Sequence, residues 1–99
     1  MNRVVIVAPL RPGTYDRAAA LIQAGPPFDL RDSGLDEHAV YLSSDEAVFV
    51  FEGAEAEFAV HDIVDDPVRS ASFSAWAPLL AGRPRLAQEA FAWRRPPPS

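Results

Sequence analysis

The apolar positions of this chain fall into short continuous runs and periodic stretches, separated by polar or proline-rich breaks. Residues 4–10 are apolar throughout, and residues 47–52 are apolar up to the final glutamate. Successive side chains of a strand point to opposite faces, so such runs need cover on both sides. The pattern therefore predicts two central strands, with the second leading into Gly53.

A helical period follows the first run. From Tyr15 to Ile22, apolar residues recur at i, i+3, i+4 and i+7, which lines one face of a helix. Thr14 stands at the N-cap position, and Gly25, followed by two prolines, ends the pattern. We expect one helix between these two residues.

Two further stretches have the looser pattern of edge strands. Residues 35–42 mix polar and apolar side chains on both parities, as an edge strand does. Residues 85–94 alternate more strictly, with Phe91 and Trp93 on one parity, and predict the last strand. Residues 96–99 read Pro-Pro-Pro-Ser and predict a disordered tail.

The remaining stretch predicts a second helix in two parts. Residues 54–66 are helical in period, with Ala56, Val60, Ile63 and Val64 on the apolar side. Asp66 and Pro67 restart a helix as N-cap and first-turn proline, and Pro78 bends or ends it. This second part carries three large apolar residues at helical spacing: Phe73, Trp76 and Leu80.

The order of elements is βαββαβ, which predicts a single ferredoxin-like α+β domain over residues 1–95. In this topology helices cover one face of an antiparallel sheet, and strands one and three are central. The uncovered face would expose several hundred Å² of apolar surface, more than monomers usually show. At ~25 cal/mol per Å², its burial is worth on the order of 10 kcal/mol before association costs. We therefore expect a homodimer with sheets packed face to face.

Composition excludes several classes of function. The chain has no cysteine, which excludes disulfides and thiolate sites, and its nine basic residues are all arginine, which excludes lysine Schiff-base chemistry. A net charge of −5 opposes binding to nucleic acid. No apolar run approaches the ~20 residues of a membrane span, and no signal peptide is recognisable. We expect a cytoplasmic protein without a membrane or nucleic-acid partner.

Few residues are candidates for chemistry. His38, Tyr41 and Arg69 are the candidate catalytic residues, with His38 either a general base or a solvated surface group. His61 shares a helical face with Glu57 and Asp65, which favours helix-stabilising pairs over a metal site. No metal or cofactor is expected.

Aromatic residues are more numerous than these candidates. They lie on the predicted helices and edge strands, which bound the gap between helices and sheet. They either fill the core or line an apolar pocket for a planar organic ligand. Arg31, Arg69 and Arg94 are candidate anchors for an anion or carbonyl group. Phe91 belongs to this aromatic set, and the candidate ligand-binding residues are Tyr15, Tyr41, His61, Phe73, Trp76 and Trp93.

Three segments carry a family resemblance. They are "VAPLRPG" at the end of the first strand, Asp66-Pro67 followed by Pro78, and "LAQEAFAW", which ends in Trp93. On the basis of these segments, the chain resembles the dimeric α+β barrel superfamily and is weakly similar to its aromatic polyketide cyclases. The resemblance implies a dimer, and an activity of the cofactor-free monooxygenase or cyclase type, but it assigns no catalytic residue.

Three hypotheses of function remain open. The first is a dimeric protein that binds a small apolar or aromatic molecule between sheet and helices without catalysis. The second is a cofactor-free enzyme, a monooxygenase or cyclase, in which His38, Tyr41 or Arg69 assists. The third is an interaction module in which dimerisation is itself the function, and it predicts no enclosed cavity.

Overall fold

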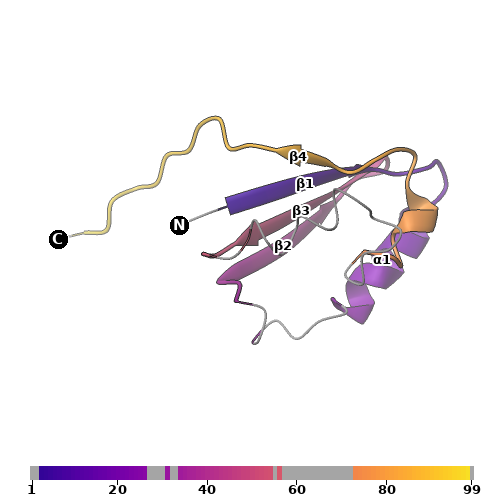
Figure 1. Ribbon diagram of the computed structural model, residues 1–99, viewed down its shortest axis with the longest axis horizontal. Coiled ribbons are helices and arrows are strands. Elements are labelled where there is room, and N and C mark those ends of the chain that lie inside the picture. The colour runs from indigo at the N-terminus through magenta and orange to yellow at the C-terminus, as the bar shows by residue number, and fades with distance from the viewer. Residues whose placement is uncertain (1–2, 27–30, 32–33, 55, 57–72, 99) are drawn as a thin grey trace.

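The computed structural model describes residues 3–26, 31, 34–54, 56 and 73–98. Four strands and two helices lie in these ranges (Figure 1). In chain order they are β1 (Arg3–Pro9), α1 (Tyr15–Ala24), β2 (Glu37–Leu42), β3 (Glu46–Glu52), a short 3₁₀ helix (Ala77–Leu79) and β4 (Arg85–Ala87).

The four strands form one antiparallel sheet in the order β2-β3-β1-β4. β1 and β3 pair over their full length, from Arg3 opposite Glu52 to Pro9 opposite Glu46. The two most apolar strands are therefore central, and β2 and β4 lie at the edges. This confirms the strand order predicted from the sequence.

Helix α1 begins and ends where the pattern predicts. Thr14 is its N-cap, but the Thr14 hydroxyl donates to the carbonyl of Arg11, at 2.7 Å, and makes no hydrogen bond to the helix. At the other end Gly25 has a φ of 86°, and its N–H donates to the carbonyl of Ile22 at 3.1 Å. Glycine tolerates this positive φ, which lets the chain leave the helix.

The hydrophobic core lies on the face of the sheet that α1 covers. Side chains at alternate positions of β1 and β3 are buried there, together with Ala18 of α1 and the segment at residues 73–80. We call this the helix-side face. Its buried strand residues are Ile6, Ala8, Ala47, Phe49 and Phe51.

Most of the second predicted helix, residues 57–72, lies outside the described residues. Its described end is not α-helical: residues 73–76 form turns, and Ala77–Leu79 form a 3₁₀ helix. The N–H groups of Leu79 and Leu80 bond to carbonyls three residues back, at 2.9 and 3.2 Å. Pro78 has no N–H to donate, which accounts for the loss of α-helical bonding at this point. The described residues thus form an open antiparallel sheet with one α-helix, not the complete βαββαβ arrangement.

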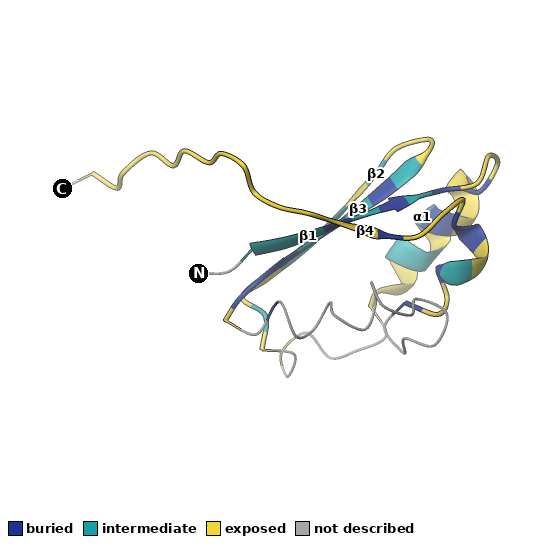
Figure 2. Ribbon diagram, turned by 45° about the horizontal axis from the view of Figure 1, so that its top comes forward, coloured by how far each residue is buried: buried dark blue, intermediate teal, exposed yellow. Residues whose placement is uncertain are grey.

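The last strand is shorter than predicted. β4 ends at Ala87, opposite Val5, whereas the alternation in sequence predicts a strand to residue 94. Continuing this register would place Glu89 opposite Arg3, where β1 begins. Further residues would therefore have no neighbour on β1, and residues 88–98 form neither helix nor strand. Figure 2 shows this segment exposed along its length, up to and including the three prolines.

Candidate functional site

The face of the sheet opposite α1 is apolar. Val5 lies opposite Val50 and Val7 opposite Val48, and all four valines are only partly buried. In the described part of the chain, α1 and residues 73–80 lie on the other side, so no described element covers these valines (Figures 1 and 2). By register, the residues of this open face are Val5, Val7, Ala39, Tyr41, Val48, Val50 and Ala87.

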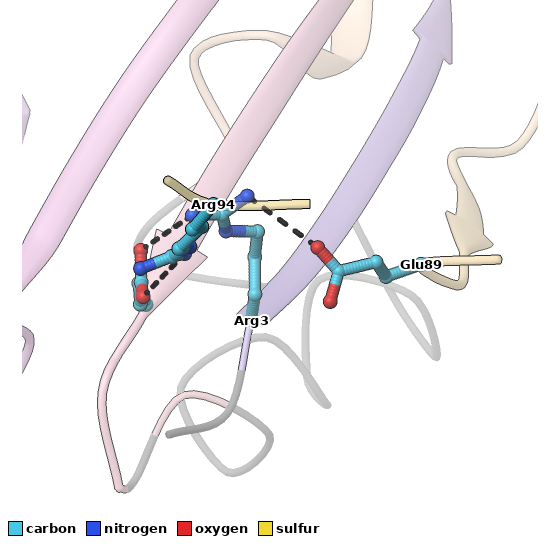
Figure 3. Close-up of polar contacts among 4 residues, drawn as sticks. Arg3, Glu89 and Arg94 are labelled. Atoms are coloured by element: carbon cyan, nitrogen blue, oxygen red, sulfur yellow. Dashed lines mark hydrogen bonds and ion pairs between the residues drawn. The ribbon is translucent and has the colours of Figure 1, made fainter. Parts of the chain in front are cut away.

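A cluster of charged residues bounds the open face at one end (Figure 3). Glu52, at the end of β3, is only 3% exposed. Its Oε2 accepts a hydrogen bond from Arg3 Nη2 at 3.1 Å, and its Oε1 accepts one from Arg94 Nη2 at 3.4 Å. Arg3 Nη1 also lies 3.5 Å from Glu89 Oε1. We call these four residues the charged end.

The charged end holds Glu52 in its ionised form. The hydrogen bond from Arg3 lowers the pKa of the Glu52 carboxyl, against the opposing effect of burial, and Arg94 adds to the lowering. Since both carboxylate oxygens accept hydrogen bonds from arginines, Glu52 is poorly suited to act as a base. Its contacts instead join β1, β3 and the segment after β4.

The chain passes tightly around the end of β3 that carries Glu52. The N–H of Asp36 donates to the Glu52 carbonyl at 2.7 Å. Gly53 has a φ of 154°, and a Cβ at this position would lie 2.9 Å from the carbonyl oxygen of Gly34. A glycine is therefore required where the loop before β2 crosses the end of β3.

Three aromatic side chains meet on the helix-side face. The rings of Phe73 and Trp76 are nearly parallel, with centroids 6.2 Å apart. Phe49 contacts both edge-on, at 5.2 Å from Phe73 and 4.9 Å from Trp76. The structure thus brings Phe73 and Trp76 of the predicted aromatic set together. All three rings are buried in the core.

His38, the first of the candidate catalytic residues, lies beside this cluster on β2. Its ring stacks on Phe51, with centroids 4.6 Å apart and an angle of 26° between the planes. His38 Nδ1 lies 2.9 Å from the carbonyl oxygen of Val50. A carbonyl only accepts hydrogen bonds, so Nδ1 carries the proton in this contact. Both contacts orient the partly buried imidazole.

Other members of the predicted ligand-binding set lie apart from that cluster. Tyr41 is 63% exposed on the open face, because its parity on β2 places it opposite Val48. Trp93 is 64% exposed beyond the end of β4, and Tyr15 is 48% exposed at the start of α1. The expectation that these aromatics, with Phe91, bound one gap between sheet and helices is therefore wrong for Tyr41, Phe91 and Trp93.

The other candidate residues either lie outside the described residues or lie at the surface and at the charged end. His61 and Arg69 lie outside the described residues, as do Glu57 and Asp65. Arg31 is exposed, and Arg94, a predicted anion anchor, is bound to Glu52. Within the described ranges, no three His, Asp or Glu residues are grouped as a metal site would require. The described residues include no helix that is both long and apolar enough to span a membrane.

Sequence reasoning missed the charged end. The signal was present, since Arg3 precedes the first apolar run and Glu52 closes the other. Two adjacent antiparallel strands place the start of one beside the end of the other, so these opposite charges could have been paired. The contacts of Glu89 and Arg94 depend on the path that the chain takes after β4, and no sequence pattern predicts that path.

Comparisons of the chain with protein families, with curated proteins and with solved structures found no match.

Proposed function

We propose that this chain forms a homodimer with its sheets packed face to face, as in dimeric α+β barrels. We further propose that each copy binds a small apolar or aromatic molecule on the helix side of its sheet, without catalysis. The observation that carries the proposal is the open face, where four valines and their neighbours have no described element over them. The strand order β2-β3-β1-β4, which is that of the ferredoxin-like split βαβ, supports the same architecture.

The aromatic residues on the helix side support ligand binding. The near-parallel rings of Phe73 and Trp76, with Phe49 edge-on, are buried together and would form one apolar wall of such a site. His38, stacked on Phe51, adds a polar group on the same side of the sheet. Walls of this kind, with few polar groups, suit planar organic ligands.

Two features favour binding over catalysis. An acid–base mechanism needs a donor and an acceptor within reach of one substrate atom. Among the described residues, the buried carboxylate of Glu52 is held by arginines at the charged end, and it shares the parity of the open face. His38 lies on the opposite face, so the two groups do not form a pair.

Light scattering tests the dimer. We expect the full chain to elute at twice its monomer mass at micromolar concentration, because burial of the open face stabilises the pair. A monomeric mass across the accessible concentration range would refute the proposed architecture.

Intrinsic fluorescence tests the ligand site. The chain has two tryptophans, so the Trp93→Phe variant leaves Trp76 as the only one. We expect 2-naphthoic acid to change the emission of Trp76 saturably. The Trp76→Phe variant is the matched control, since it leaves only Trp93, whose emission should not respond through this site. No response from Trp76 to this acid or to neutral 2-naphthol would count against a planar-ligand site at this wall.

A cofactor-free enzyme is the second candidate, and the fixed orientation of His38 favours it. In that case a dihydroxynaphthalene should be consumed with uptake of oxygen. The His38→Ala variant would then lose turnover while retaining affinity for the naphthalene. Loss of affinity without any turnover in the parent chain would leave the binding function as the better account.

A further inference from the structure

The segment after β4, residues 88–98, carries the two most exposed large apolar side chains of the described residues. Phe91 is 85% exposed and Trp93 is 64% exposed. Phe91 and Trp93 lie two positions apart, so in an extended segment both side chains point to the same side. We call residues 88–98 the terminal arm. An arm that shows two aromatic rings on one side has the form of a binding element.

Two contacts, from Glu89 and Arg94, fix the arm at the charged end of the sheet. Arg3 contacts Glu89, and Arg94 donates to Glu52. Farther along, the guanidinium of Arg95 lies 5.3 Å from the centre of the Trp93 ring. Figure 1 shows the chain after β4 running past the end of the sheet toward the C-terminus, so apart from the charged end it does not cover the open face of its own copy.

We infer that Phe91 and Trp93 of each copy pack against the open face of the second copy. This inference rests on the homodimer proposed above, and it names the residues that complete the interface. Each copy then supplies both an apolar face and the aromatic side chains that cover it. A twofold dimer requires such self-complementarity, because the same surface must serve on both subunits.

The dimensions allow this exchange. An extended segment spans ~3.3 Å per residue, so the four residues from 90 to 93, between the bound Glu89 and Arg94, span up to ~13 Å. Two sheets that pack face to face lie ~10 Å apart. Phe91 and Trp93 can therefore reach the partner's open face while Glu89 and Arg94 stay bound at their own charged end.

Charge is also complementary. Arg95 lies on the arm beside Trp93, while Glu37 and Glu46 lie at the edges of the open face, on the parity of its valines. An arginine arriving from the second copy would meet these carboxylates as the aromatic rings meet the valines. A second copy thus matches the face in polarity and charge.

The test compares self-association of the full chain with that of the double variant Phe91→Ser/Trp93→Ser by sedimentation velocity. We expect the dissociation constant of the dimer to rise by about 100-fold or more, because buried aromatic anchors dominate interfaces. The matched control is Tyr15→Ser, which removes an exposed ring from α1 on the other side of the sheet. Circular dichroism should show both variants folded, since all three side chains are exposed in a single copy.

Trp93 itself reports the same event. On dilution through the dissociation range, its emission should shift to longer wavelength as the ring returns to water. The Trp93→Phe variant, in which only Trp76 emits, should show no such shift.

The outcomes separate the two proposals. A parent chain that is monomeric at every concentration would overturn both. A dimer that dissociates at the same concentration with and without the two rings would overturn this inference alone, as would a Trp93 emission that is unchanged by dissociation.

Discussion

The two faces of the sheet are built from the same strands and from similar side chains, yet they differ in burial. Along β1, Ile6 is fully buried on the helix-side face, while its neighbours Val5 and Val7 are only partly buried on the open face. Along β3, Phe49 is buried between Val48 and Val50, which are again partly exposed. Burial in this molecule is therefore decided by what lies over a face, and not by the residues of the strand.

Placing one charge on each face gives the strongest test of this comparison. Ala47 is fully buried on the helix-side face, where an unpaired carboxylate cannot be solvated. We expect Ala47→Asp to lose several kcal/mol of stability, enough to unfold a domain of this size. Urea titration followed by circular dichroism measures the loss.

The adjacent residue on the open face is the control. Val48→Asp should leave a folded chain that no longer dimerises, since the new carboxylate is accessible to water in the single copy. Equal destabilisation by the two substitutions would mean that both faces are closed within one chain.

Removal of a large core side chain should have the next largest effect. Phe49 contacts Phe73 and Trp76, so Phe49→Ala leaves a cavity beneath both rings. We expect a loss of about 3–5 kcal/mol in the free energy of unfolding. Tyr41→Ala on the open face should cost less than about 1 kcal/mol to the single copy. A similar loss for both variants in urea would show that exposure does not separate these positions.

The charged end should contribute a smaller, pH-dependent part of the stability. Contact with Arg3 lowers the pKa of Glu52 below its ordinary value of 4.5, so the unfolded chain takes up a proton at a higher pH than the folded chain does. The stabilisation is thus fully present above pH 4.5 and is lost as pH falls through the lower, folded pKa.

The Glu52→Gln variant removes this titration. We expect it to be less stable than the parent chain at pH 7, with the two urea midpoints converging as pH is lowered toward 3. Glu89→Gln is the control, because Glu89 contacts Arg3 only at the exposed margin of the cluster. A constant difference between parent and Glu52→Gln at all pH values would show that Glu52 is not stabilised as an anion.

The smallest effect is expected at the edge of the helix-side face. His38→Ala removes the contact to the Val50 carbonyl and the stacking on Phe51, for a loss of about 1 kcal/mol in unfolding free energy. His38→Phe keeps a ring over Phe51 and should recover part of the loss. No change in the urea midpoint for His38→Ala would mean that these two contacts do not stabilise the position of β2 in the sheet.

Side-chain periodicity was sufficient to predict the strands and α1, because it depends on local geometry. The continuous apolar runs identify β1 and β3 as central, and the helical spacing from Tyr15 to Ile22 identifies α1. The extent of β4 could not be predicted in the same way. Alternation continues to residue 94, but a strand persists only where a neighbouring strand offers hydrogen bonds, and β1 begins at Arg3.

The candidate site was less predictable for a related reason. On β2 both parities mix polar and apolar residues, so the pattern does not tell which side of the sheet each side chain faces. Only the register with β3 places His38 on the helix-side face and Tyr41 on the open one. The contact of Arg94 with Glu52 joins residues 42 positions apart, which no local pattern encodes.

The three prolines that follow Arg95 have a consequence for how far assembly can proceed. Exposed aromatic segments next to unpaired strand edges are common starting points for fibrils, in which each chain adds to the edge left by the last. Proline has no N–H and cannot take part in such a ladder. A strand that pairs with this segment should therefore not extend beyond Arg95. This limit favours a closed dimer over a growing fibril.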